Sequence, residues 1–341
     1  MKRLTLEKIA ELANTSRSAV SRVINEQNGV KPEVRERVLQ VIEKTKYQPN
    51  QAARSLASKR TGVIGIVIPR IVQSLFGDPY FPTLIQGIAQ SCNANDYVPS
   101  LFLFYNKDEE QKLYRRVLHR GFVDGIIITA SQVGDPLVPQ LIEHEVPFIV
   151  IGRPDDTAQV NFVDVDNVAA GHAATAHLLR LGYKRIAHIA GPNNESPGID
   201  RLEGYYNALN QREIAIEPIL VAEGEFTEEG GYFAMKQLLP LRPEAVFAAS
   251  DMMAFGAMRA IRENGLNIPQ DIALVGFDDL PAAAITTPPL TTIRQPIRRI
   301  GTLAVETLVD ILENGLYPIR NMILGTQLVV RESCGTNLAA T

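Results

Sequence analysis

The chain has 341 residues, of which 45% are hydrophobic and 21% charged, a composition typical of a soluble globular protein with about two domains. No apolar run reaches the ~18–20 residues of a membrane-spanning helix, and the basic start MKRLTLEKIA lacks the apolar core of a signal peptide. We therefore expect a cytoplasmic protein without a membrane partner.

The net charge of −4 conceals an asymmetry along the chain. Residues 1–60 contain 13 Lys or Arg and 6 Glu, which gives +7, whereas the remainder contains 21 basic and 32 acidic residues, which gives −11. A basic segment ahead of an acidic body favours nucleic acid as a partner at one end only.

The stretch TLEKIAELANTSRSAVSRVIN, residues 5–25, predicts two short helices on either side of a break at Asn14 and Thr15. Apolar residues recur at helical spacing in both halves, and Ser16 stands where a side chain would cap the second helix. Two short helices joined by a tight turn make a helix-turn-helix, whose second helix can enter the major groove of DNA.

The polar face of the second helix carries the residues that would contact DNA. Arg17 and Arg22 can each donate two parallel hydrogen bonds to a guanine edge, or bind a phosphate. The alternative is a plain helical hairpin with a solvated basic face. The polar face consists of Arg17, Ser18, Ser21, Arg22 and Asn25.

Residues 29–49 predict a third helix, because Pro32 suits its first turn and Lys44 and Lys46 suit its last turn. The following NQAARSLASK, residues 50–59, contains helix formers but is too short to be a stable isolated helix, since these need about 12–15 residues. It is either a flexible linker or a helix that folds on a partner.

The remainder of the chain alternates short apolar runs with helical stretches, which predicts an α/β body with parallel sheets. It is too long for one sheet of ordinary size, so we expect two lobes. The predicted strands are 63–68, 125–129, 148–151, 186–190, 245–249 and 273–277, and the predicted helices are 81–95, 109–120, 168–181, 201–211, 228–239, 252–264 and 297–313.

Ligands of parallel sheets bind beyond the carboxyl ends of the strands, and here polar and aromatic residues follow several predicted strands. Rings that stack on C–H faces, combined with Asp, Arg and Asn, suit a sugar. Each residue also has a structural alternative: Tyr80 and Phe81 as core, Arg201 in a surface ion pair, and Asp251 as a helix cap. Asp278 and Asp279 could form a turn.

The motif at residues 5–25, the segment YQPNQAARSLAS and the ending LVVRES at 328–333 together resemble the LacI/GalR family of bacterial transcription regulators. The resemblance implies a helix-turn-helix headpiece at 1–49, a hinge at 50–60, and a two-lobed body resembling periplasmic sugar-binding proteins at 61–341. It implies crossings between the lobes near 162, 290 and 324. Lobe 1 would hold about 61–161 and 291–323, and lobe 2 about 162–290 and 324–334.

The resemblance also implies roles for individual residues. Arg17, Ser18 and Arg22 would read bases, and Leu56 would wedge between base pairs in the minor groove. Phosphate or sugar contacts are expected from Thr5, Ser16, Ser21, Asn25 and Tyr47, and minor-groove contacts from Asn50, Ala53, Arg54 and Ala57. The effector cleft would contain Asp78, Tyr80, Phe81, Arg153, Arg201, Phe226, Asp251 and Asp278.

These observations predict a ligand-controlled repressor that binds a near-palindromic double-stranded DNA operator as a homodimer and responds to a sugar or sugar oligomer. The alternatives are a sugar-binding protein without a DNA role and a purine-responsive regulator. An enzyme is disfavoured, because no dinucleotide fingerprint, P-loop or nucleophile elbow is found. We expect no cofactor and no metal, and Cys92 and Cys334 are expected to be buried thiols.

Overall fold

The computed structural model describes residues 4–24, 27–47, 60–68, 76–119, 121–129 and 132–336. The chain divides into two compact units, Met1–Thr61 and Gly62–Thr341. Among the described residues, no helix is long and apolar enough to cross a membrane.

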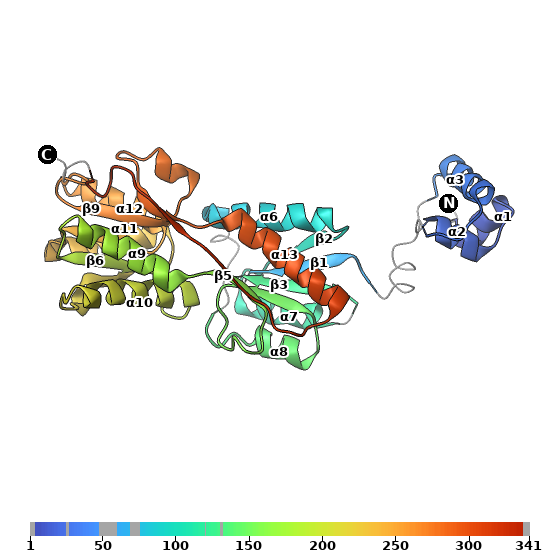
Figure 1. Ribbon diagram of the computed structural model, residues 1–341, viewed down its shortest axis with the longest axis horizontal. Helices are drawn as coiled ribbons and strands as arrows, with labels where there is room; N and C mark the ends of the chain where they lie inside the picture. The colour runs from blue at the N-terminus through green and yellow to red at the C-terminus, as the bar shows by residue number, and fades with distance from the viewer. Residues whose placement is uncertain are drawn as a thin grey trace. The chain divides into compact units, whose positions relative to one another are not determined.

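The first unit is a helix-turn-helix followed by a third helix, as the sequence predicts (Figure 1). Thr5 Oγ1 accepts a hydrogen bond from Lys8 N at 3.4 Å, and Ser16 Oγ accepts one from Ala19 N at 3.2 Å. These side chains cap the first two helices and satisfy backbone groups that would otherwise lack partners. The helices are α1 (Leu6–Leu12), α2 (Arg17–Ile24) and α3 (Pro32–Thr45), and their shared core comprises Ile9, Ala10, Ala13, Val20, Val23, Val38 and Tyr47.

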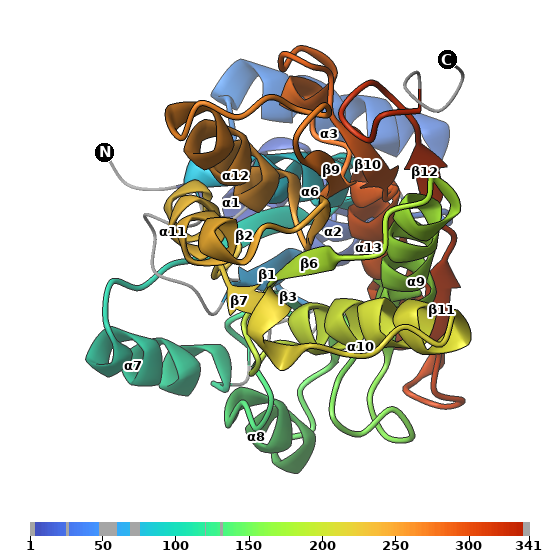
Figure 2. The same cartoon turned by 90° about the vertical axis from the view of Figure 1, so that its left-hand side faces the viewer.

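The second unit contains two six-stranded sheets, and each has a helix layer on both faces (Figures 1 and 2). The first sheet is parallel throughout, in the order β11-β5-β4-β3-β1-β2. Helices α6 (Tyr80–Ala94) and α13 (Ile297–Asn314) share a core on one face, and α7 (Lys107–Val117) and α8 (Leu137–Glu143) share one on the other. The strands are β1 (Val63–Val67), β2 (Val98–Phe102), β3 (Gly125–Thr129), β4 (Phe148–Ile151), β5 (Phe162–Val165) and β11 (Asn321–Leu324).

The second sheet has the order β12-β10-β9-β8-β6-β7, in which β12 is antiparallel to β10. Helices α9 (Asn167–Arg180) and α10 (Ser196–Gln211) cover one face, and α11 (Glu228–Leu238) and α12 (Asp251–Glu263) cover the other. The strands are β6 (Ile186–Ala190), β7 (Val221–Glu223), β8 (Ala245–Ala248), β9 (Ala273–Asp278), β10 (Thr291–Arg294) and β12 (Gln327–Val329).

The chain crosses between the sheets three times, after β5, after β10 and after β11. Two crossings come later than expected, because residues 162–165 pair with β4 in the first sheet and residues 291–294 pair with β9 in the second. Both segments, FVDV and TTIR, contain polar residues. They therefore lack the continuous apolar run by which buried parallel strands are recognised.

Pairs of glycines allow the helices on three sheet faces to cross at backbone contact. In α6, a Cβ at Gly87 would overlap the carbonyl oxygen of Arg298 in α13, and a Cβ at Gly301 in α13 would lie 2.5 Å from the carbonyl oxygen of Leu84 in α6. Such distances exclude any side chain without a shift of the helices. The same reciprocal arrangement joins α9 to α10 through Gly171 and Gly204, and α11 to α12 through Gly231 and Gly256.

Replacing Gly87 by alanine is expected to destabilise the second unit by about 1–3 kcal/mol, because the added methyl group forces α6 and α13 apart. The matched control is Gly77→Ala, where an added Cβ meets nothing within 4 Å. Urea unfolding followed by circular dichroism measures both. Equal stability of the two variants would show that the crossing tolerates a side chain.

Candidate functional site

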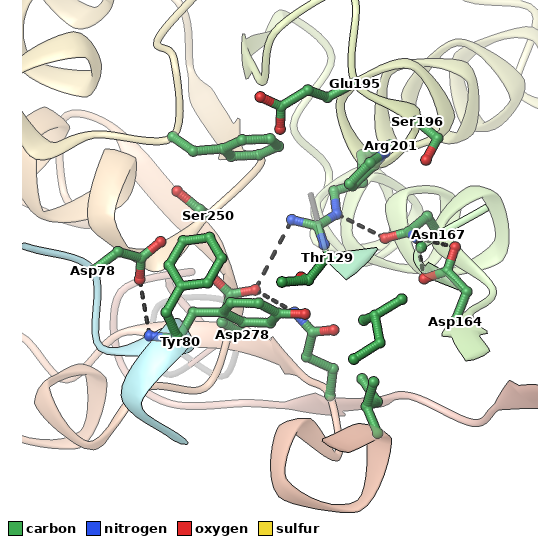
Figure 3. A pocket seen from close by; sticks show the side chains of 17 residues that line it. Asp78, Tyr80, Thr129, Asp164, Asn167, Glu195, Ser196, Arg201, Ser250 and Asp278 are labelled. Atoms are coloured by element: carbon green, nitrogen blue, oxygen red, sulfur yellow. Dashed lines mark hydrogen bonds and ion pairs between the residues drawn. The ribbon is translucent and has the colours of Figure 1, made fainter. Parts of the chain in front are cut away.

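A pocket lies where the carboxyl ends of strands from both sheets face each other (Figure 3). Its empty space is about 720 Å³, counted out to its opening into solvent. It is lined by Asp78, Tyr80, Phe81, Thr129, Ile151, Gly152, Asp164, Asn167, Glu195, Ser196, Pro197, Arg201, Phe226, Ser250, Asp278, Gln295 and Ile300.

Arg201 on α10 is the central cation of this pocket, and only 6% of it is exposed. Its Nε donates to Asn167 Oδ1 at 2.9 Å, and one terminal nitrogen donates to the carbonyl oxygen of Ala249 at 2.6 Å. The guanidinium carbon lies 3.6 Å from the centre of the Phe277 ring, a cation–π contact. A buried guanidinium is tolerated only when its N–H groups are satisfied in this way.

Asp278, at the end of β9, is the anion nearest to Arg201, at 3.9 Å. Its Oδ1 accepts a hydrogen bond from Gln295 Nε2 at 2.6 Å. The pKa of Asp278 is raised to about 7, mainly by burial. The charge of Arg201 opposes this rise, and the charge of Asp78 contributes to it. Its backbone has φ +119°, a conformation rare outside glycine and concentrated at functional sites.

Asp164 on β5 supplies a second buried carboxylate. It accepts hydrogen bonds from Asn167 Nδ2 at 3.1 and 3.3 Å. Burial raises the pKa of Asp164 to about 6, although the Val165 N–H and the charge of Arg201 act to lower it. Asn167 thus joins Asp164 to Arg201 through one amide, as Figure 3 shows.

Aromatic rings form the apolar part of the pocket. Tyr80 and Phe81 meet edge to face with their centroids 5.3 Å apart, and Asp78 Oδ1 accepts a hydrogen bond from Tyr80 N at 2.9 Å. The Phe226 ring lies 5.6 Å from the guanidinium carbon of Arg201. It packs over Gly191, where an added Cβ would overlap the ring.

Six of the eight residues predicted to bind an effector line this pocket, and two do not. Arg153 lies outside it and pairs with Asp200 of α10, its Nε 3.0 Å from Asp200 Oδ2. Asp251 is fully buried, where it accepts hydrogen bonds from Thr292 Oγ1 at 2.6 Å and Leu280 N at 2.7 Å. The helix cap at this point is Ser250, not Asp251.

The sequence prediction missed several polar residues of the pocket. Asp164 lies on β5 and Gln295 directly follows β10. The sequence did not predict these two strands, because they contain polar residues. The single aspartate within the otherwise apolar segment FVDV is the sequence feature that could have indicated a binding residue on a buried strand. The missed polar residues are Thr129, Asp164, Asn167, Glu195, Ser196, Ser250 and Gln295.

In the first unit, Arg17, Ser18 and Arg22 on α2 are exposed, and Ser21 is half-buried. Arg17 forms an ion pair with Glu7 at 3.2 Å, and Ser18 is hydrogen-bonded to Ser16 at 2.9 Å. Tyr47 packs its ring into the core and is 8% exposed. Six predicted DNA contacts, at Asn25, Asn50, Ala53, Arg54, Leu56 and Ala57, lie outside the described residues.

Comparison with known proteins identifies the class. Residues 5–50 match "Bacterial regulatory proteins, lacI family", and residues 175–334 match a periplasmic binding protein-like domain. The chain is 38% identical to the HTH-type transcriptional regulator CelR of Thermobifida fusca, over 97% of this chain and 98% of that protein.

Two solved structures are similar over nearly the whole chain. A complex of a transcriptional regulator CelR with cellobiose has a TM-score of 0.78 at 35% identity, covering 97% of this chain and 100% of that one. A lac repressor dimer bound to operator and the anti-inducer ONPF has a TM-score of 0.85 at 28% identity, covering 98% and 99%. The chain belongs to the LacI family of bacterial regulatory proteins. It is a DNA-binding transcription regulator.

Asparagine at position 278 is expected to flatten the dependence of stability on pH. Because burial raises the folded-state pKa of Asp278 to about 7, above the ~3.9 of an unfolded chain, the folded state binds more protons between these values. The free energy of unfolding contributed by this group therefore falls as pH rises from about 4 to 7.

Urea unfolding of wild type and Asp278→Asn at pH 5, 6, 7 and 8 tests this expectation. Between pH 5 and 6, the free energy of unfolding of the wild type should fall more steeply with pH than that of Asp278→Asn, by up to about 1.4 kcal/mol per pH unit. Identical slopes for the two proteins would mean that Asp278 is not protonated in the folded state.

Proposed function

We propose that this regulator is a dimeric repressor that binds a near-palindromic operator through residues 1–60 and a neutral sugar in the pocket of residues 61–341. The observation that supports it is the network of Arg201, Asp278, Asn167 and Asp164 beside aromatic rings. Because its target is bacterial operator DNA, the protein acts in the cytoplasm.

The chemistry of the pocket favours a polyhydroxy ligand without a negative charge. Sugar hydroxyls both donate and accept, so they suit a site that offers a guanidinium, amides and carboxyl groups, and the C–H faces of a sugar ring suit Phe226 and Tyr80. Against one cation, Arg201, the pocket presents four carboxyl groups, at Asp78, Asp164, Glu195 and Asp278. A phosphate or carboxylate ligand would be repelled by them.

The adjacent acids Asp278 and Asp279 have separate partners, which supports a binding role and no catalysis. Asp278 accepts from Gln295, while Asp279 pairs with Arg294 and Arg331, each at 2.6 Å. Acid–base catalysis needs a carboxyl group within hydrogen-bond reach of the reacting atoms, and Asp279 is engaged by two arginines instead.

A ligand held between the sheets would favour one angle between them, because its contacts come from both. Thr129 ends β3 and Asp164 lies one residue before the end of β5, both in the first sheet, whereas Asp278 ends β9 of the second. That angle would set the spacing of the two hinge segments in a dimer, and so the affinity for the operator. Reciprocal coupling of ~1–3 kcal/mol between sugar and operator is the typical size of such an effect.

The test is selection of bound DNA from a random pool at moderate salt, followed by titration of the selected DNA complex with neutral sugars and with purines. Recovery of a palindrome whose binding one sugar changes supports the proposal. A purine as the active ligand would overturn the sugar assignment and leave a regulator. Failure to enrich any sequence would contradict the operator, and a response to sugar without DNA binding would favour a plain sugar-binding protein.

Arg22→Ala is expected to weaken binding to the selected operator by about 1–3 kcal/mol and to relax its preference at one base pair, because a bidentate contact to a guanine edge would be lost. Arg37→Ala, which removes an exposed arginine from α3, is the matched control and should bind nearly as wild type. Quantitative binding to operator and single-base variants measures both. Equal loss in the two variants would indicate general electrostatics and no base reading.

Arg201→Ala is expected to abolish the response to sugar and to leave operator affinity intact, because this guanidinium lies in the pocket of the second unit. The control is Arg259→Ala, which removes an exposed arginine of α12 that is paired with Glu228 of α11 at 3.0 Å. Titration of each operator complex with sugar measures the response. Loss of DNA binding by Arg201→Ala would instead mark it as structural.

A further inference from the structure

A second cavity opens beside the pocket, on the side of α8. Its empty space, counted to its opening into solvent, is about 1,050 Å³, which exceeds that of the pocket itself. Its walls come from the segment that leads from β3 into α8, from α8 itself and from the segment between β4 and β5. We call it the outer cavity and the pocket around Arg201 the inner pocket.

The two cavities meet at Ser196, which lines both. Gly152 lines the inner pocket, and the next residue, Arg153, lines the outer cavity. The two cavities therefore adjoin at the first turn of α10.

Contacts between the two sheets frame this junction. Arg153, which follows β4, forms an ion pair with Asp200 of α10. In addition, Val133 N donates to the carbonyl oxygen of Asn194 at 2.8 Å, and Gln132 and Glu195 form an isolated antiparallel bridge. The two sheets are thus held together next to the point where the cavities adjoin.

The outer cavity has an apolar wall that is left exposed to solvent. Val133 is 52% exposed and Ile142 is 44% exposed, and Pro139 and Pro154 lie in the same lining. Apolar walls with a few polar groups are the usual composition of a small-molecule site. The C–H face of a sugar ring would cover such a wall, and Gln159 would meet its hydroxyls.

The charge of the outer cavity restricts the ligand further. Four carboxyl side chains line it, at Asp135, Glu143, Asp155 and Asp156. Its lining contains one cation, Arg153, and that guanidinium is already paired with Asp200. A phosphorylated sugar or a uronic acid would be repelled here, whereas a neutral sugar would not.

We propose that the outer cavity binds the second and later units of a neutral oligosaccharide whose first unit occupies the inner pocket. The effector is therefore an oligosaccharide and not a monosaccharide. This inference rests on the proposed function, because it assumes a sugar in the inner pocket.

The experiment compares the affinities of the full chain for sugars of one, two and three units by isothermal titration calorimetry. The probes are glucose, xylose and mannose with their β-linked dimers and trimers, and maltose and maltotriose. In the series that binds, the dimer or trimer is expected to bind at least tenfold more tightly than the monomer.

Ile142→Trp fills the outer cavity from an exposed position and is expected to remove this tenfold gain, with the affinity for the monomer within twofold of wild type. If Ile142→Trp folds poorly, Val133→Trp provides the same test, because Val133 also lines the outer cavity but lies in the segment before α8. Ile219→Trp is the matched control, since Ile219 is also exposed, at 62%, and lies outside both cavities.

Three outcomes would contradict the proposal, in distinguishable ways. Equal affinity for monomer and oligomer, or an equal loss for both in Ile142→Trp, would overturn the outer subsite and leave the proposed function standing. Tighter binding of glucose 6-phosphate than of any neutral oligomer would overturn the choice of ligand class. Binding of no sugar at all would overturn the proposed function and this inference together.

Discussion

The arrangement of the pocket depends on one buried guanidinium, that of Arg201. Removing Arg201 from water costs several kcal/mol, and the cost is offset only while every partner stays in place. Those partners come from the start of α9, the end of β8 and the end of β9. The crossing of α9 and α10 is part of the same arrangement, since the backbone of Arg201 lies directly against Gly171. The position of the charge and the packing of the two helices are therefore set together.

The site exists only because the chain passes three times between two sheets. Asp164 lies on β5 of the first sheet, and three residues later Asn167 begins α9, which covers the second sheet. The amide of Asn167 consequently connects carboxylate and guanidinium across a crossing segment. The ion pair of Arg153 with Asp200 adds a second connection between the sheets. Under the proposed function, a ligand that replaces or strengthens such contacts would change the preferred angle between the sheets, and a difference in ligand affinity between two such states is the physical requirement for allosteric control.

Local sequence signals predicted the first unit and the buried strands well, because caps and apolar runs act over a few residues. Ser16 caps α2 where the sequence places it. The prediction failed where pairing with neighbouring strands, and not the local sequence, determines the secondary structure. FVDV and TTIR are strands because they pair with β4 and β9. The pocket residues Asp164 and Gln295, which lie on or next to these strands, were therefore missed. Position after a strand also does not fix the direction of a side chain. Arg153 turns to Asp200 and Asp251 turns to Thr292, so neither lines the pocket around Arg201, although Arg153 lines the outer cavity beside it.

The reciprocal glycine pairs have a mechanical consequence. Where two helix backbones touch with no side chain between them, there is no rotamer that could change to let one helix slide along the other. A displacement at Arg201 would therefore move α9 and α10 together, and α6 and α13 would move as a pair over the first sheet for the same reason. Any change in the angle between the sheets would then be taken up by the three segments in which the chain crosses between them. Substitutions in the pocket would then change which ligand is bound, while the paired helices that move with it stay the same.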